Sequence, residues 1–428
     1  MNVVSASDRG RLARTLRTGW AAPEGVVAAV GEILAAVRER GDAAVVEYAR
    51  RFDDPAFDPS HLRVPIPAYE RAGDLVAPGI ADAFAIAKDR IERFHERQRP
   101  ADLAYAAEDG SRYGLHRRPL GSIAAYVPGG AGALISSVLM CVLPAKIAGV
   151  ARAIVLTPPR RDGRLDPGLL FACSLCGVDE LYAVGGAQAI AAAAFGTETI
   201  APVEKIVGPG GVWTTEAKRQ VFGVCGIDGL AGPSEVLVVA DDGANSEYVA
   251  GELLAQAEHA GAARLAVVSE SRPLLEAVAQ LLDTLDVKTL ERGHLISDAI
   301  ERDCCLIHAA TRDEVFDLIE RFAPAYLCLQ VRDASQYVPR IHRAGAIFVG
   351  DMTPLACGDY LAGTNHVVPT SGTARFSSSL SLADFMRSFS VVENSLERMQ
   401  TDAAAIAELA ELEGLPQHAA TVRMRHDG

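Results

Sequence analysis

The chain has 428 residues, of which 49% are hydrophobic and 22% charged, and its formal net charge is −14. A domain usually holds about 100–200 residues, so we expect two to four units. The acidic balance argues against a nucleic-acid partner, because non-specific nucleic-acid binding needs a basic surface. No uninterrupted apolar stretch reaches about 18 residues, so we expect no membrane span.

The first residues, MNVVSASDRGRLARTL, contain neither an apolar core nor a small-residue cleavage site, so we expect no secretory signal. Eight cysteines are scattered through the chain, which is typical of thiols in a reducing compartment. These features predict a cytoplasmic protein. Cys173 and Cys176 form a Cys-x-x-Cys pair in an apolar helical pattern, with no second pair to complete a zinc site. We interpret them as core residues.

Residues 1–122 are predicted to form a largely helical N-terminal region that packs partly with the domain that follows. Apolar residues recur at helical spacing over 26–49, with a break at Gly41–Asp42, and again over 80–97. No chemistry is visible in this region.

From Ile123 onward, short β-rich runs alternate with helical patterns, which predicts an α/β protein with parallel sheets. The expected strands are 123–127, 153–157, 181–184, 235–239, 265–269, 304–308, 326–331 and 346–350. The expected helices between them include 134–148, 246–259 and 273–285. These strands are too many for one sheet unit, so we predict two Rossmann-like domains, 123–235 and 236–379, with the crossing at 226–234.

Residues 351–379 are rich in Gly, Thr, Ser and Pro, and a loop of this length is usually functional. After Leu380 the chain is predicted to turn helical again, through a helix at 394–413. Residues 380–428 would then form a small C-terminal helical unit.

Glycine turns recur in the first predicted Rossmann-like domain. Gly130-Ala131-Gly132-Ala133 follows a strand and precedes a helix, but it lacks the third glycine of the usual dinucleotide fingerprint. Such a turn can present N–H groups to a phosphate, or it can simply be a tight turn. Further glycine turns lie at 185–186, 208–211 and 232–234. Repeated turns at strand ends favour a nucleotide or substrate crevice there.

Candidate metal ligands lie in two places. Gln256 and His259 are three residues apart, so their side chains project from one face of the predicted helix. A histidine at a helix end can equally be a cap or a core residue. Asp359 and His366 lie in the long polar loop. Asp359 could be a metal ligand or only make turn hydrogen bonds, and His366 could be a ligand or a proton-transfer group. His418 follows the last predicted helix, where it could simply be a surface residue without a functional role.

Several long, ordered segments together resemble histidinol dehydrogenases, over nearly the whole chain and most strongly from Gly121 to His418. They are Tyr126–Gly130, Val138–Met140, Pro144–Gly149, Val184–Ile190, Thr215–Val221, Ala231–Val236, Gln256–His259, Gly358–Tyr360, Gly363–His366 and Gly372–Ser378. The resemblance implies an intertwined homodimer with two Rossmann-like domains, the first on the NAD side, and one zinc ion per site.

The resemblance also implies roles for individual residues. Zinc would be held by Gln256, His259, Asp359 and His418, the last supplied by the partner subunit. These four also touch the substrate in the family. Further family positions match Tyr126, Gln188 and Gly211 for NAD, and Ser234, His366 and Glu413 for the substrate.

Three positions depart from the family pattern. The family's Pro-Glu-His-Leu, whose Glu–His pair transfers protons, is Pro324-Ala325-Tyr326-Leu327 here. Ala325 cannot act as a base, and a tyrosine with its ordinary pKa of about 10 is a poor one unless a nearby cation lowers that pKa. Gly211 replaces an asparagine near NAD, which should weaken or reshape cofactor binding. Gly229 replaces a bulky apolar residue, which should widen the substrate pocket.

These departures predict a divergent zinc-dependent, NAD-linked dehydrogenase acting on a small polar alcohol. It would stop at the carbonyl or use a changed substrate, with Tyr326 and His366 as candidate catalytic residues. One alternative is an authentic histidinol dehydrogenase that consumes two NAD, with Glu258, His366 or Glu413 replacing the lost pair. Another is a non-catalytic, zinc-stabilised binding protein. NAD and NADP are not distinguished, since no acidic fingerprint residue follows the first glycine turn.

Overall fold

The computed structural model describes residues 1–16, 19–129, 134–160, 162–230, 232, 234–259 and 263–426. The chain divides into two compact units. The first comprises residues 1–98 and 120–385, and the second comprises residues 99–119 and 386–428. No helix in the described part of the chain is long and apolar enough to cross a membrane.

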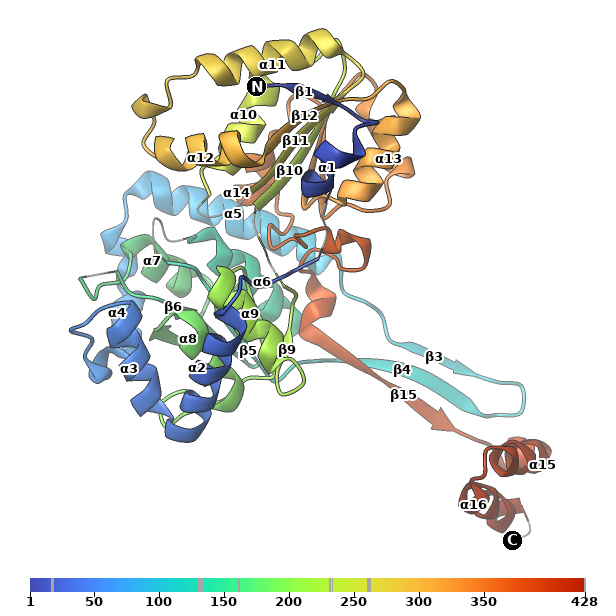
Figure 1. The fold of residues 1–428 in the computed structure, drawn as a ribbon. Helices are drawn as coiled ribbons and strands as arrows, with labels where there is room; N and C mark the ends of the chain where they lie inside the picture. The colour runs from blue at the N-terminus through green and yellow to red at the C-terminus, as the bar shows by residue number, and fades with distance from the viewer. Residues whose placement is uncertain are drawn as a thin grey trace. The chain divides into compact units, whose positions relative to one another are not determined.

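The first unit contains two sheets of mostly parallel strands (Figure 1). Within the described residues, the first sheet has the order β2-β7-β6-β5-β8-β9, and every neighbouring pair except β2 and β7 is parallel. Its strands are β2 (Arg63–Val64), β5 (Ser122–Tyr126), β6 (Arg152–Thr157), β7 (Glu180–Ala183), β8 (Lys205–Val207) and β9 (Gly226–Ile227).

Helices cover both faces of this sheet. One face packs against α2 (Val26–Arg40), α3 (Asp42–Phe52), α8 (Gly186–Phe195) and α9 (Val212–Val221). Helix α6 (Ser136–Ala148) contacts β5 and β6, and it packs against α5 (Pro78–Glu96) and α7 (Pro167–Leu175), which in turn contacts α4 (Ile66–Glu70).

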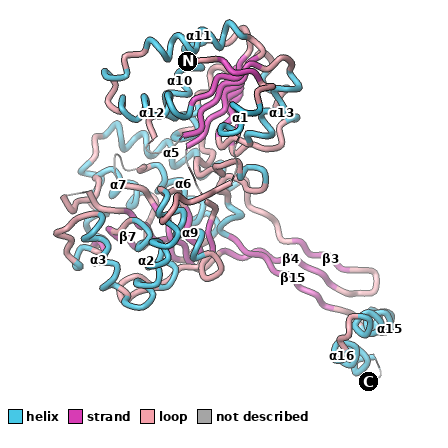
Figure 2. Tube along the Cα trace, in the orientation of Figure 1, coloured by secondary structure: helices cyan, strands magenta, loops and turns pink. Residues whose placement is uncertain are grey.

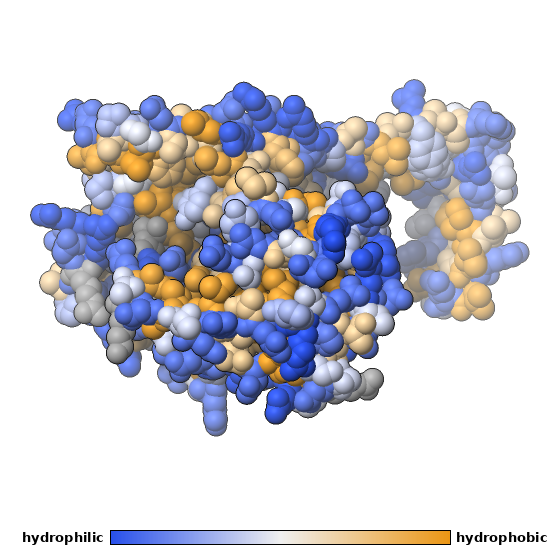
Figure 3. All heavy atoms as spheres, turned by 90° about the horizontal axis from the view of Figure 1, so that it is seen from above, coloured by the Kyte–Doolittle hydropathy of each residue, from blue (hydrophilic) through white to orange (hydrophobic). Residues whose placement is uncertain are grey.

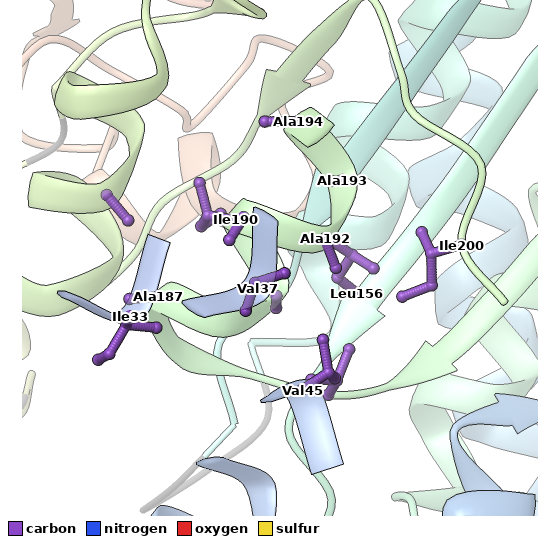
Figure 4. Packing of buried hydrophobic residues seen from close by; sticks show 14 of the residues in the cluster. Ile33, Val37, Val45, Leu156, Ala187, Ile190, Ala192, Ala193, Ala194 and Ile200 are labelled. Carbon is purple, nitrogen blue, oxygen red and sulfur yellow. The ribbon is translucent and has the colours of Figure 1, made fainter. Parts of the chain in front are cut away.

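The core under α2 and α8 follows from the residue pattern. Val30, Ile33 and Val37 lie on one face of α2 because they recur at helical spacing, and all three are buried. The facing helix α8 is rich in alanine, as Figure 4 shows for Ala187 and Ala192–Ala194, and small side chains allow the two helices to pack closely.

The second sheet of this unit has the order β1-β12-β11-β10-β13-β14 among the described residues, and all of its pairs are parallel (Figure 2). Its strands are β1 (Val3–Ser5), β10 (Ser234–Ala240), β11 (Ala263–Ser269), β12 (Cys304–His308), β13 (Tyr326–Gln330) and β14 (Ala346–Val349).

Alternating residues of this sheet enter two separate cores. Val236 and Val238 face α10 (Ser246–Ala257), α11 (Arg272–Thr284) and α12 (Gly293–Asp303). Leu237 and Val239 pack on the other face against α1 (Arg9–Thr15) and α13 (Arg312–Phe322). Because both faces are covered, the strands read as continuous apolar runs.

Each sheet has a switch point, where successive strands of the chain are added on opposite sides of one strand. In the first sheet, β5 is flanked by β6 on one side and β8 on the other, and in the second sheet β10 is flanked by β11 and β13. In open α/β sheets, ligands bind outside the carboxyl ends of the strands at such points.

The second unit has little core of its own. A three-stranded antiparallel sheet has the order β15-β4-β3, formed by β3 (Leu103–Ala106), β4 (Arg112–Pro119) and β15 (Met386–Glu393). Helices α15 (Leu396–Leu412) and α16 (Pro416–His426) share a small cluster formed by Ala407, Ala410 and Ala419.

The predicted α/β class with parallel sheets is confirmed, but some local predictions differ from the structure. Among its described residues, the region 1–122 also contains four strands, two of which lie in the mostly parallel sheets. Residues 386–393 form β15 rather than continuing as a helix, because they pair with β4, which is far away in the sequence. The glycine turn 130–133 lies outside the described residues, as do Ala231 and Pro233 of the predicted crossing.

Candidate functional site

A cavity of about 290 Å³, here called the inter-sheet cavity, is lined by segments that follow strands of both sheets of the first unit. Two of the lining residues follow strands of the first sheet. They are Ser137 at the start of α6, which follows β5, and Pro209, which follows β8. The remaining side chains used below come from the second sheet and its loops: Ser234, Gln256, Glu258, His259, Ala325, Tyr326, Asp359 and His366. The fold therefore brings together six predicted site residues that span more than a hundred positions.

Gln256 and His259 lie at the end of α10, where the backbone N–H of His259 donates to the Gln256 carbonyl at 3.3 Å. Gln256 is buried. Neither its Nε2 atom nor the Nδ1 atom of His259 has a hydrogen-bond partner. A buried polar atom without a partner typically costs about 1–3 kcal/mol, so these two side chains are suited to a ligand.

Asp359 lies on the short helix α14 (Leu355–Tyr360) and faces Tyr326, the first residue of β13. The Tyr326 hydroxyl donates to Asp359 Oδ1 at 2.8 Å and lies 3.2 Å from the carbonyl oxygen of His366. Burial, followed by the Asp359 charge, raises the pKa of Tyr326 well above its ordinary value. The hydroxyl therefore keeps its proton and acts as a donor to the carboxylate.

Glu252 on α10 helps to fix the position of α14. One oxygen of this buried carboxyl accepts a hydrogen bond from the backbone N–H of Leu355 at 3.1 Å. Burial raises the pKa of Glu252. Two polar contacts, one from Glu252 and one from Tyr326, thus orient the helix that carries Asp359.

His366 is held with a defined tautomer. Its Nδ1 atom lies 3.0 Å from the backbone carbonyl of Asp359, and a carbonyl can only accept, so Nδ1 carries the proton. The Nε2 atom is then an acceptor, and it lies 3.3 Å from the hydroxyl of Ser137. Burial lowers the pKa of His366, so the imidazole is neutral at pH 7.

The side chains of this cavity fit a zinc ion, although they do not form a complete site by themselves. Neither here nor elsewhere in the described parts of the chain are three or more His, Cys, Asp or Glu side chains grouped to hold a metal. The cavity offers the Gln256 amide, the His259 imidazole and the Asp359 carboxylate, which are donors that zinc accepts. Turning the amide by half a rotation would present its oxygen in place of the unpartnered nitrogen.

Two of the predicted site residues belong to the second unit. Glu413 is the C-cap residue of α15, and His418 lies in α16. Their predicted roles toward the metal and the substrate therefore depend on the packing of that unit and remain predictions.

A second cavity of about 380 Å³, here called the cofactor cavity, lies at the carboxyl ends of β5 and β8. It gathers Tyr126, Gln188 and Gly211, the three positions predicted to contact NAD. The Tyr126 hydroxyl accepts a hydrogen bond from the backbone N–H of Gly186 at 3.1 Å. The predicted cofactor residues thus meet at the switch point of the first sheet, where a dinucleotide is expected.

The loop after β8 is fixed by a buried ion pair. Asp228 accepts from the backbone N–H of Gly208 at 2.7 Å and pairs with Lys218, whose ammonium also donates to the Gly208 carbonyl at 2.9 Å. Gly208 has a φ of +105°, and a Cβ there would collide with the carbonyl oxygen of Tyr126, so only glycine fits.

The two cavities share two loops. The segment after β5 contributes Pro128 to the cofactor cavity and Leu134 to the inter-sheet cavity. The segment after β8 contributes Gly211 to the first and Pro209 to the second. A cofactor that follows residues 209–211 from one cavity would therefore approach the other.

Comparison with known proteins identifies the family. A family model described as histidinol dehydrogenase matches residues 19–426. A histidinol dehydrogenase of Rhodospirillum rubrum is 45% identical over 399 residues, covering 92% of this chain and 91% of the relative. A second, from Desulfotalea psychrophila, is 44% identical over 404 residues, covering 94% and 93%.

The chain belongs to the histidinol dehydrogenase family. Among solved structures, the histidinol dehydrogenase from Elizabethkingia anophelis matches with a TM-score of 0.92 and 31% sequence identity, covering 99% of this chain and 98% of that structure.

Our expectation of a divergent alcohol dehydrogenase, limited to one oxidation or changed in substrate, is wrong. Relatives that are 41–45% identical over 92–97% of the chain are named histidinol dehydrogenase. The substitution of Ala325 and Tyr326 for the family's Glu–His pair does not by itself indicate a different reaction, because the rest of the chain matches the family. In the structure these two residues form one part of the cavity wall, while Gln256, His259 and Asp359 still converge on its interior.

Two side chains of the site were missed from the sequence. Ser137 carries no motif, and only the fold brings it to His366. Asp53 lines the cofactor cavity although it follows a helix in the N-terminal region, far from every glycine turn. Neither position carries a signal that periodicity or spacing could reveal.

Proposed function

We propose that the chain oxidises L-histidinol to L-histidine with two molecules of NAD. The observation that carries this proposal is the inter-sheet cavity, where an amide, an imidazole and a carboxylate meet beside a cavity suited to a dinucleotide. The names of the relatives, at 41–45% identity over nearly the whole chain, supply the substrate.

The reaction balances as two successive oxidations. In the first, the carbinol carbon loses a hydride to NAD and its hydroxyl loses a proton, which gives the aldehyde. Water then adds to the aldehyde, and the hydrate loses a second hydride to a second NAD and two protons to give the carboxylate. The protein must therefore accept protons and orient a water molecule in the same cavity.

Gln256, His259 and Asp359 are the residues of this chain that would hold zinc, with His418 of a second copy of the chain as the fourth ligand. When bound, zinc would polarise the substrate oxygen, and NAD would accept the hydride. The unpartnered Gln256 and His259 atoms support this assignment, because a bound ion would relieve their missing interactions.

His366 is the group that we assign to proton transfer in place of the family's Glu–His pair. Its Nδ1 proton is committed to the Asp359 carbonyl, so Nε2 presents a lone pair beside Ser137 at the cavity wall. The Ser137 hydroxyl can donate to that lone pair and accept a proton from substrate or water in turn. Together the two side chains form a short relay in which only hydroxyl and imidazole protons move.

Tyr326 has a different task in this proposal. Its hydroxyl is committed to Asp359 Oδ1, so it orients the carboxylate rather than removing a substrate proton. Ala325 next to it contributes only a methyl group to the cavity wall, which leaves room for the water needed in the second oxidation.

We also propose that the active form is a homodimer. The second unit leaves many large apolar side chains exposed and has a core of a few alanines. Its exposed apolar residues are Leu103, Tyr105, Phe389, Val391, Val392, Leu396, Ile406, Leu409, Leu412, Leu415 and Met424. The face drawn in Figure 3 likewise carries apolar patches among polar side chains. A second copy would cover such surfaces and bring Glu413 and His418 to the site.

The yield of NADH per molecule of L-histidinol tests the proposal. Zinc-loaded protein is given limiting histidinol and excess NAD, and the product is identified by mass spectrometry. Two NADH with L-histidine are expected. One NADH with a trapped aldehyde would overturn the two-step reaction, and no NADH would favour the non-catalytic alternative.

A further inference from the structure

One carboxylate enters the cofactor cavity. Asp53 is the single charged side chain among its described lining residues, whose other members are apolar, aromatic, glycine or uncharged polar. Asp53 is the C-cap residue of α3, where its backbone N–H donates to the Ala49 carbonyl at 2.9 Å. The Gln188 amide nitrogen lies 3.4 Å from its Oδ2 atom. The backbone of Asp53 is thus anchored to the helix, and its carboxylate contacts a predicted cofactor residue.

The surroundings of Asp53 suit a neutral hydrogen-bond donor. Burial is the sole cause that raises its pKa, to about 6, and no described Lys, Arg or His residue compensates its charge. At neutral pH the group is ionised and partly desolvated, which is unfavourable until donors bind to it. An anionic group in the same place would be repelled by the ionised carboxylate.

The usual position for such an acid is occupied by another residue. In dinucleotide-binding folds, a carboxylate after the second strand accepts a hydrogen bond from the ribose 2′-hydroxyl. The second strand here is β6, and Pro158 follows it. The backbone packs tightly around this proline, since a Cβ at Gly129 would lie 2.7 Å from its Cγ atom. Arg160, a possible partner for a 2′-phosphate, is paired with Asp166 instead.

We infer that Asp53 determines the preference for NAD over NADP, by accepting hydrogen bonds from the adenosine ribose hydroxyls and repelling a 2′-phosphate. Gln188 holds the carboxylate in position for this contact. The aromatic rings of Phe52 and Trp213, which are 53% and 45% exposed, line the same cavity and offer faces for the adenine. The inference rests on the proposed function, because it requires a dinucleotide in this cavity.

Fluorescence titration tests the inference without turnover. The sequence contains two tryptophans, so Trp20→Phe leaves Trp213, in the cavity wall, as the reporter. Dissociation constants for NAD and NADP are measured in this background with and without Asp53→Asn. The substitution should weaken NAD binding by about 10- to 100-fold, the range for a hydrogen bond to a charged group. NADP binding should be unchanged or stronger, so the preference for NAD should collapse.

Asp54→Asn is the matched control. Asp54 lies next in sequence but outside the cavity, and its Oδ1 accepts from the backbone N–H of Ala56 at 2.9 Å, which asparagine can also do. This variant should keep the wild-type preference. Asp53→Ser provides a second uncharged variant should Asp53→Asn fail to fold.

Two negative results have different meanings. NAD binding with an unchanged NAD-to-NADP ratio in both Asp53 variants would overturn the inference and leave the proposed function intact. The absence of binding of either dinucleotide to the parent protein would overturn both.

Discussion

The hydroxyl of Tyr326 offers the sharpest test of how this chain holds its metal. In the proposed site, Asp359 binds zinc through a carboxylate that the Tyr326 hydroxyl orients at 2.8 Å. Tyr326→Phe removes this one oxygen and preserves the ring, which packs edge-to-face on Phe348 with ring centroids 5.5 Å apart. The change therefore isolates the hydrogen bond from the packing.

The magnitude follows from the charge of the acceptor. A hydrogen bond to a charged group is worth about 1.5–3 kcal/mol, and each 1.4 kcal/mol is a factor of about ten in affinity. Partners that orient metal ligands typically change metal affinity by about 10- to 100-fold. We expect the zinc dissociation constant of Tyr326→Phe to rise by that factor, measured by competition with a chelator of known affinity.

Tyr69→Phe is the matched control, because the Tyr69 hydroxyl is also buried but lies 3.4 Å from the carbonyl oxygen of Val178, away from the site. It should lower the free energy of unfolding by about 0.5–1.5 kcal/mol without changing zinc affinity. Wild-type zinc affinity in Tyr326→Phe would refute the assignment of this hydroxyl as an orienting donor.

Three further outcomes are expected. His366→Gln should lower kcat by about 10²- to 10⁴-fold while zinc content and NAD affinity stay at wild-type values; an unaltered kcat would exclude His366 as the proton-transfer group. Lys218→Met should lower the free energy of unfolding by about 3–5 kcal/mol in urea titrations, because it leaves the buried carboxylate of Asp228 uncompensated. Arg272→Ala, which removes one exposed ion pair, should cost at most about 1 kcal/mol, and equal losses in the two variants would contradict the argument. Burial lowers the pKa of His95, so the stabilisation from its neutral form is present above its unfolded pKa of about 6.5 and is lost as the pH falls through the lower folded pKa. His95→Gln should therefore reduce the decrease in the free energy of unfolding between pH 7 and 5. An identical pH profile in the variant and the wild type would contradict the assignment of this decrease to His95.

Local patterns in the sequence predicted much of the framework of the first unit. The run 304–308 coincides with β12, and the helical spacing with a break at Gly41 corresponds to α2 and α3. Such elements are readable because a strand buried on both faces gives a continuous apolar run, and a helix buried on one face gives apolar residues at helical spacing. Short or edge strands, such as β1 and β9, leave no period and were missed.

The candidate ligands Gln256, His259 and Asp359 were also named from the sequence, through helical spacing and the resemblance to a family. Their convergence on one cavity is a property of the tertiary structure, because α10 and α14 lie about a hundred residues apart in the chain. The role of Tyr326 could not be read in advance for the same reason. Its residue type indicated a weak base, whereas its contact with Asp359 makes it a donor.

By itself, then, the sequence determined the class of fold and the types of side chain available for chemistry, since both depend on local order and composition. Only the tertiary structure decided which side chains meet. It placed Ser137 beside His366 and brought Asp53 from the end of α3 into the cofactor cavity. Such contacts join residues distant in the chain, and their geometry depends on how whole helices and sheets pack, for which no short segment carries the information.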